Sequence, residues 1–181
     1  MYEFLLKRKI KRMLNRSDRE KVYHNLKEIK TVLVLFDTEN FADAEYFIQQ
    51  MKKLGKRVRA LAYKDKQDVR DYSKILFNIL TPKDLKDFKR ESLTQILNSF
   101  ETFSFDLIAD LSLKENLLLQ YALVSIKAPM KVGFYKAQLP IHDIIIYPHE
   151  ELENDGNTSL KELGKQLIFY LTTISSEKKI I

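Results

Sequence analysis

Short runs of continuous apolar residues alternate with longer amphipathic segments along most of this chain. A continuous run is typical of a strand that is covered on both faces of a sheet. Apolar residues at every third or fourth position indicate a helix instead. The sequence therefore predicts six strands, at 31–36, 56–63, 74–80, 105–111, 131–135 and 143–147.

The segments between these strands carry signals for the ends of helices. Gly55 stands where the helix 44–54 needs a left-handed C-terminal cap. Capping boxes, in which a Ser and a Glu three residues later exchange contacts with backbone amides, are predicted at 17–20, 112–115 and 159–162. The last of these opens a helix whose buried face is predicted to hold Leu160, Leu163, Leu167, Tyr170 and Ile174.

Regular alternation of strands and helices implies right-handed crossovers and a mostly parallel sheet. We expect an α/β fold, a three-layer Rossmann-like open sheet of about six strands with helices on both faces and the order 3-2-1-4-5-6. Such sheets bind ligands at the carboxyl ends of the strands, where the order reverses. That crevice lies beyond the first and fourth strands, and its candidate ligand-binding residues are Asp37, Thr38, Glu39, Asn40, Asp110, Ser112 and Lys114.

Residues 1–30 are interpreted as a basic helical arm ahead of a single α/β domain at 31–181. The arm holds ten Lys or Arg and four Asp or Glu, which accounts for the whole net charge of +6 and leaves the domain neutral. Three interpretations stay open: a solvated helix, a segment that binds a polyanion or a membrane surface, or a helix whose apolar face packs on the domain or on a second subunit. The surface-binding candidates in the arm are Lys7, Arg8, Lys9, Lys11, Arg12 and Arg16.

The expected location is the cytoplasm, with the arm able to hold the protein at the inner face of the membrane. No apolar run approaches the ~20 residues that span a bilayer. The apolar residues Phe4 to Leu6 precede the positive charges, whereas a secretory signal has its apolar centre after them. No transmembrane segment is therefore expected.

Several classes of site are excluded by composition. The chain has no cysteine, which excludes disulfides, thiolate nucleophiles and cysteine-based zinc sites. None of its four glycines falls in a strand-to-helix turn, so the close backbone approach to phosphate made by dinucleotide and nucleotide loops is not expected. His24, His142 and His149 follow no metal-ligand spacing. We expect no cofactor and no metal.

Two carboxylates support an enzymatic alternative. Asp37 ends the first strand and Asp110 nearly ends the fourth, so both could point into one crevice and serve as acid and base. The competing interpretation is that each binds loop amides or caps the following helix. Ser112 is explained by its capping box, and no nucleophilic role is assigned to it.

Residues 105–136 (FDLIADLSLKENLLLQYALVSIKAPMKVGFYK) resemble the N-terminal domain of heptosyltransferases, in which a similar strand, apolar helix and Val-Gly-Phe strand follow in this order. The segment 32–43 is similar to that family's first strand and loop, which ends on Gly-Asp, but here Ala42 precedes Asp43. The whole chain also resembles a family of small Bacteroidota proteins with a domain of unknown function. The heptosyltransferase resemblance implies half of a glycosyltransferase fold, without the second domain that binds the sugar nucleotide.

Three functional hypotheses follow, in order of preference. The first is a non-catalytic protein that binds a protein partner, including a second copy of itself, or a small ligand. The second is an adaptor that uses the basic arm on a membrane surface or on nucleic acid, of which nucleic acid is less expected because the domain is neutral. The third is a small enzyme with its carboxylates at the crevice.

Overall fold

The computed structural model describes residues 2–72, 77–86, 91–134, 139–147 and 159–174. Its centre is one six-stranded sheet in the order β3-β2-β1-β4-β5-β6, and every pair of neighbouring strands is parallel. This confirms the predicted fold class and strand order. The strands are β1 (Thr31–Asp37), β2 (Arg57–Tyr63), β3 (Asn78–Leu80), β4 (Leu107–Asp110), β5 (Met130–Phe134) and β6 (Ile144–Ile146).

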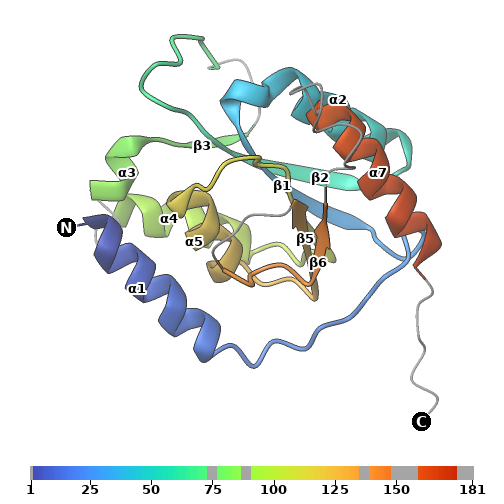
Figure 1. Ribbon diagram of the computed structural model, residues 1–181, viewed down its shortest axis with the longest axis horizontal. Helices are drawn as coiled ribbons and strands as arrows, with labels where there is room; N and C mark the ends of the chain where they lie inside the picture. The colour runs from blue at the N-terminus through green and yellow to red at the C-terminus, as the bar shows by residue number, and fades with distance from the viewer. Residues whose placement is uncertain (1, 73–76, 87–90, 135–138, 148–158, 175–181) are drawn as a thin grey trace.

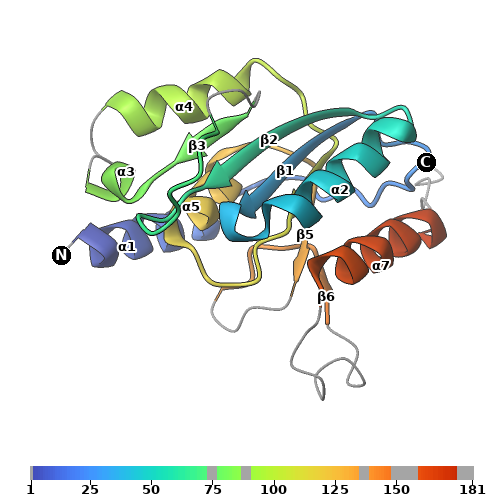
Figure 2. The ribbon, with the colours of Figure 1, turned by 90° about the horizontal axis from the view of Figure 1, so that it is seen from above.

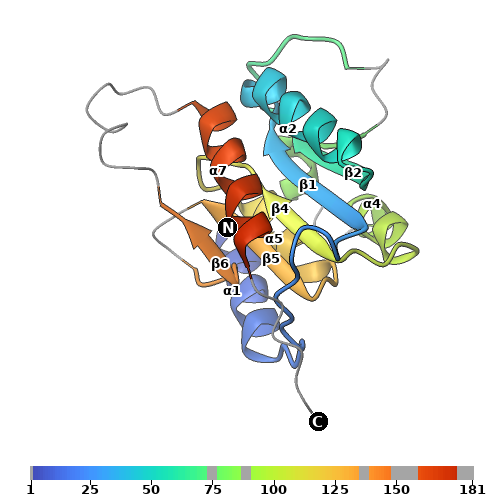
Figure 3. The ribbon, with the colours of Figure 1, turned by 90° about the vertical axis from the view of Figure 1, so that its right-hand side faces the viewer.

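Helices cover both faces of the sheet (Figures 1 and 2). One face carries α2 (Phe41–Lys53) and α7 (Leu160–Thr173), which lie side by side. The other face carries α3 (Pro82–Lys86), α4 (Glu91–Glu101) and α5 (Leu117–Ser125), with α1 (Tyr2–Asn15) packed against α5. A short 3-10 helix, η1 (Thr38–Asn40), connects β1 to α2. The result is the predicted three-layer arrangement, seen from the side in Figure 3.

Strand β1 shows why its sequence is apolar at every position. Val32, Val34 and Phe36 belong to the hydrophobic core beneath α2 and α7, whereas Leu33 and Leu35 belong to the core beneath α4 and α5. All five side chains are fully buried. A central parallel strand has no solvent-facing side, so the usual alternation of polar and apolar residues is absent.

The first helix of the arm forms as predicted and is part of the folded core. Leu6 and Ile10 are fully buried in the cluster that also contains residues of α4 and α5. The outer face of α1 remains exposed, including Phe4 and Arg8. The apolar stripe of α1 is thus already covered by the domain.

The prediction of a second helix in the arm is wrong, because residues 17–30 are not helical. Their backbone and side-chain groups bond to distant segments instead: the Val22 amide donates to Pro129 O, the Leu26 amide to Leu171 O, and the Arg19 guanidinium to Asp143. This segment carries the chain from α1 on one face of the sheet to the start of β1 (Figure 1). The tertiary contacts outweigh the local capping preference.

Two further predictions about helices need correction. Helix α5 begins at Leu117 rather than at the predicted capping box, and its N-cap is Asn116, whose side chain accepts the amides of Leu118 and Leu119. In α7 the Ser159 cap is confirmed, but Tyr170 is half exposed and Leu171 is buried in its place. The predicted left-handed cap after α2 is confirmed, since Gly55 has φ of +76°.

Candidate functional site

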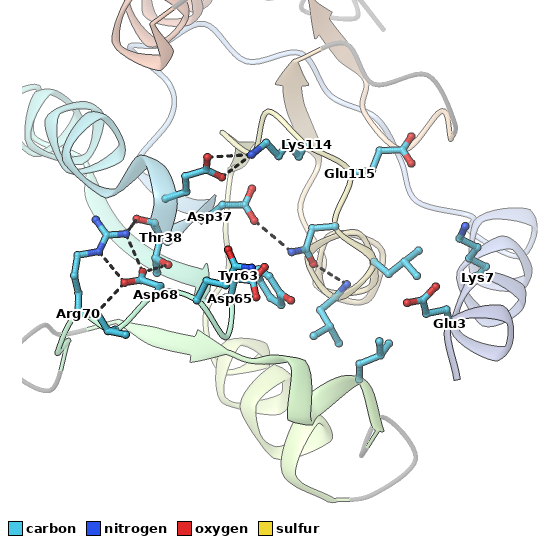
Figure 4. A pocket seen from close by; sticks show the side chains of 17 residues that line it. Glu3, Lys7, Asp37, Thr38, Tyr63, Asp65, Asp68, Arg70, Lys114 and Glu115 are labelled. Carbon is cyan, nitrogen blue, oxygen red and sulfur yellow. Dashed lines mark hydrogen bonds and ion pairs between the residues drawn. The ribbon is translucent and has the colours of Figure 1, made fainter. Parts of the chain in front are cut away.

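A cavity of about 900 Å³ lies at the carboxyl edge of the sheet, where the strand order reverses. We call it the carboxyl-edge cavity. Its wall is formed by the residues after β1, β2 and β4, together with side chains of α1 and α3 (Figure 4). Parallel open sheets place ligands at this position, because helix N-termini and strand-end loops converge there.

Asp37, the last residue of β1, contacts the residue that caps α5. Its Oδ1 accepts a hydrogen bond of 3.3 Å from Asn116 Nδ2, and Asn116 in turn caps α5 through the amides of Leu118 and Leu119. The partial positive charge of the helix N-terminus stabilises a carboxylate at this place. A polar contact thus connects the end of β1 to the start of α5 at this wall.

Asp68 organises the loop that follows β2. Its carboxylate accepts the Thr38 hydroxyl at 2.6 Å, the Tyr72 hydroxyl at 2.8 Å and the Arg70 guanidinium at 2.8 Å. Arg70 also donates to Thr38 O at 2.6 Å. The hydrogen bonds from Arg70 lower the pKa of Asp68, those from Thr38 and Tyr72 act in the same direction, and burial opposes them. Asp68 is therefore ionised and fully occupied by protein groups.

The charges on the cavity wall are unequal in number. Among the residues that the structure describes, six carboxylates and three cationic side chains line it. Arg70 pairs with Asp68, and Lys114 pairs with Glu39 at 2.8 Å. Apart from those pairs and Asp37, the described part of the wall holds the carboxylates of Glu3, Asp65 and Glu115 and one further cation, Lys7.

Tyr63 is the phenol on this wall. Burial, and then the negative charges of Asp65 and Asp37, raise its pKa. The hydroxyl therefore stays protonated at neutral pH and can donate a hydrogen bond. In Figure 4 it lies near Asp37 and Asp65, between the Asp68 cluster and the side chains of α1.

The structure brings some of the predicted site residues together and separates others. Asp37, Thr38, Glu39 and Lys114 line the carboxyl-edge cavity. Asn40, Asp110 and Ser112 are not part of its wall. The predicted pair of carboxylates is thus divided, with Asp37 at the cavity and Asp110 in the interior.

Asp110 belongs to a buried polar cluster. Its Oδ1 accepts the Ser112 hydroxyl and, at 3.0 Å, the Ser112 amide, while its Oδ2 lies 3.0 Å from His142 Nε2. Asp110 and Ser112 are almost fully buried. Asp110 therefore holds Ser112 in the loop after β4 and His142 just before β6. Both contacts stabilise the fold.

The sequence reasoning missed the loop after β2. Asp65, Asp68 and Arg70 supply a large part of the wall, yet the prediction considered only the strand ends at the reversal point. Since β2 neighbours β1, the polar residues that directly follow Tyr63 were the available signal. Glu3 and Lys7 had no comparable signal, because nothing in the sequence placed α1 at this edge.

The basic residues of the arm lie in different surroundings. Lys7 lines the carboxyl-edge cavity. Lys9, Arg12 and Arg16 line a second cavity described below, and Arg8 and Lys11 are exposed away from both. The arm is therefore not one uniform surface.

Within the described ranges, no group of three or more His, Asp or Glu side chains is arranged to hold a metal ion. None of the helices in that part of the chain is long and apolar enough to cross a membrane.

The chain belongs to a family of unknown function, DUF6913, whose sequence model matches residues 3–174. This confirms the resemblance of the whole chain to a family with a domain of unknown function. No curated protein matches the chain. The heptosyltransferase resemblance of residues 105–136 is not confirmed.

Among solved structures, the chain is similar to an exopolyphosphatase-related protein from Bacteroides fragilis, with 13% sequence identity and a TM-score of 0.48. The match covers 81% of this chain and 41% of that one, so this chain spans about two fifths of its length. Similarity at this level supports no statement about activity.

Proposed function

We propose that this member of the DUF6913 family is a binding protein that holds a small organic cation, an amine or a guanidinium compound, in the carboxyl-edge cavity. The observation that carries the proposal is the surplus of carboxylates on the wall of a cavity at the reversal point of the sheet. A cationic ligand would complement the charge that Lys7, Arg70 and Lys114 leave uncompensated.

Hydrogen bonding supports the same class of ligand. An ammonium or guanidinium group has only donors and needs acceptors around it. Asp65 and Glu115 are exposed acceptors on opposite parts of the wall, one after β2 and one before α5. The protonated Tyr63 hydroxyl can still accept a hydrogen bond through its oxygen.

The test is calorimetric titration with agmatine, putrescine and spermidine, with nucleotides and sugar nucleotides as the anionic comparison. The variant Asp65→Asn/Glu115→Gln should weaken binding of the amine by about tenfold. The matched control is Glu45→Gln/Glu162→Gln, which removes two exposed carboxylates from α2 and α7 outside the cavity.

Lys114→Met distinguishes a cationic from an anionic ligand. Removing this cation leaves Glu39 as one more acceptor, so affinity for an amine should rise. An anionic ligand would instead bind more weakly to this variant. Nucleotide binding that depends on Lys114, without amine binding, would overturn the proposal.

A second candidate function is attachment to an anionic membrane surface through α1. The observation in its favour is the outer face of that helix, where Arg8 and Lys11 are exposed beside Phe4, which is 68% exposed. Basic residues near an anionic surface each contribute about 1 kcal/mol. Since Leu6 and Ile10 are core residues, the test is Arg8→Gln/Lys11→Gln in vesicle sedimentation rather than deletion of the arm.

A further inference from the structure

A second cavity, of about 920 Å³, lies at the opposite edge of the sheet. It is enclosed by the C-terminal half of α1, by the residues that precede β4 and by those between α5 and β5. We call it the amino-edge cavity. No residue that the structure describes lines both this cavity and the carboxyl-edge cavity.

The inner wall of the amino-edge cavity is apolar. Phe105 and Ile126 are buried, and Met13, Phe103 and Val124 are partly buried beside them. The Phe103 and Phe105 rings lie 6.1 Å apart between centroids. Such a surface favours an acyl chain or an aromatic ring, because binding removes apolar area from water.

Six cationic and three acidic side chains of the described ranges also line this cavity. Two of the cations are occupied by the protein: Arg19 donates to Ala128 O, Pro129 O and Asp143, and Lys131 Nζ donates to Leu123 O. These contacts satisfy carbonyl groups at and beyond the end of α5, which is a structural role.

Arg12, Arg16 and Lys127 are different. All three are exposed, and within the described residues their side chains have no ion pair or hydrogen bond. They come from two separate segments, the C-terminal end of α1 with the turn that follows it and the turn after α5, and line the same cavity. Their free donors match a carboxylate or a phosphate.

Ser125, the last residue of α5, adds a neutral polar group to the wall. Its hydroxyl oxygen is buried and has no hydrogen-bond partner in the described part of the chain. Buried hydroxyl groups are normally paired, so an unpaired one next to a cavity indicates a partner that enters from the cavity.

We propose that the amino-edge cavity binds a small amphiphilic anion, a carboxylate or phosphate group attached to an acyl chain or an aromatic ring. The anionic group contacts Arg12, Arg16 and Lys127, and the apolar part lies on Phe103, Phe105 and Ile126. This site and its ligand are independent of the amine site proposed above.

The experiment is calorimetric titration of the full chain with dodecyl phosphate below its micelle concentration. Dodecylamine tests the role of charge, and inorganic phosphate tests the role of the apolar part. We expect saturable binding of dodecyl phosphate at one site, and binding at least about tenfold weaker for both comparison compounds. Equal binding of dodecylamine would overturn the proposal.

Variants locate the site. Arg12→Gln/Arg16→Gln should weaken dodecyl phosphate by at least about tenfold, whereas Arg8→Gln/Lys11→Gln should change it by less than about twofold. The control removes the same charge from α1, at exposed positions outside the cavity. An equal loss in both variants would show a general charge effect and overturn the site.

A membrane source for the ligand is distinguished by a second titration with anionic vesicles. Binding to vesicles without binding to free dodecyl phosphate would overturn the cavity and leave the outer face of α1 as the contact. Agmatine binding in the Arg12→Gln/Arg16→Gln variant separates the two sites. It should be unchanged, so failure of one proposal is not failure of the other.

Discussion

Asp110 Oδ2 and His142 Nε2 lie 3.0 Å apart in the interior, although 32 positions separate the two residues in the sequence. The contact passes over strand β5, where Gly133 is the residue paired with Asp110. A Cβ at position 133 would lie 2.4 Å from His142 Nε2. The absence of a side chain at Gly133 is therefore what allows the imidazole to reach the carboxylate.

Gly133→Ala should destabilise the protein by about 2 kcal/mol or more, because the added methyl group forces His142 away from Asp110 and breaks their buried contact. The measurement is denaturant unfolding at neutral pH. Gly164→Ala is the control: its Cβ would lie 3.2 Å from a Phe47 ring carbon, a contact that a small shift relieves. A Gly133→Ala protein as stable as the wild type would contradict the role given to this contact.

Sequence patterns predicted the strands well because the central strands β1, β4 and β5 are buried on both faces, as Leu33 and Val34 show in β1. They failed for residues 17–30, where a capping preference competes with the contacts of Arg19 to Pro129 and Asp143, the residues directly before β5 and β6. Local propensity contributes about 1 kcal/mol at such a cap, and several tertiary contacts exceed it.

The candidate site was predicted only in part, and for a similar reason. Asp37 and Lys114 were found because the topology rule identifies strand ends. Asp110 was predicted to lie at the crevice because its position near the end of a strand does not show whether its side chain is buried. Its partner His142 also lies far along the chain. The contribution of Glu3 depends on the packing of α1, which no local pattern reveals.

Leu6→Ala should cost about 2–4 kcal/mol, because the side chain is fully buried in the core that includes α4 and α5. Phe4→Ala, on the outer face of the same helix, should change stability by less than about 0.5 kcal/mol. Thermal unfolding followed by circular dichroism gives both values. Equal, small effects would mean that α1 is not held against the domain.

The N-cap of α5 gives a third prediction. Asn116 accepts two backbone amides and donates to Asp37, whereas Ser159, the cap of α7, accepts one amide and donates to Asp43 at 3.4 Å. We expect Asn116→Ala to cost about 1–2 kcal/mol and Ser159→Ala roughly half of that. The comparison uses denaturant midpoints. The reverse order would show that the link to Asp37 adds nothing.

Lys131 should make the free energy of unfolding depend on pH in the alkaline range. Burial, and then the positive charge of Arg19, lower the pKa of its ammonium group to about 8, and Asp143 opposes them. Between that value and 10.5, the unfolded chain binds the proton and the folded protein does not. Stability should therefore rise with pH across this range, by up to about 3 kcal/mol.

Lys131→Met isolates this contribution from the other groups that titrate in the same range. The difference in unfolding free energy between wild type and variant should change with pH from 8 to 10.5 and be constant below 7. The measurement is a series of denaturant titrations at different pH values and fixed ionic strength. A difference that is the same at all pH values would mean that Lys131 is not buried as a cation.

Ser125→Ala should stabilise the protein in the absence of ligand. The Ser125 hydroxyl oxygen is buried without a hydrogen-bond partner among the described residues, so its removal relieves a desolvation cost of about 1 kcal/mol. Alanine also has a higher helix propensity than serine at the end of α5.

The same variant should bind dodecyl phosphate more weakly, since the hydroxyl is then missing from the wall of the amino-edge cavity. Stability and affinity would thus move in opposite directions, as expected when a polar group is kept for a ligand rather than for the fold. A loss of stability would show instead that the hydroxyl already has a partner within the protein.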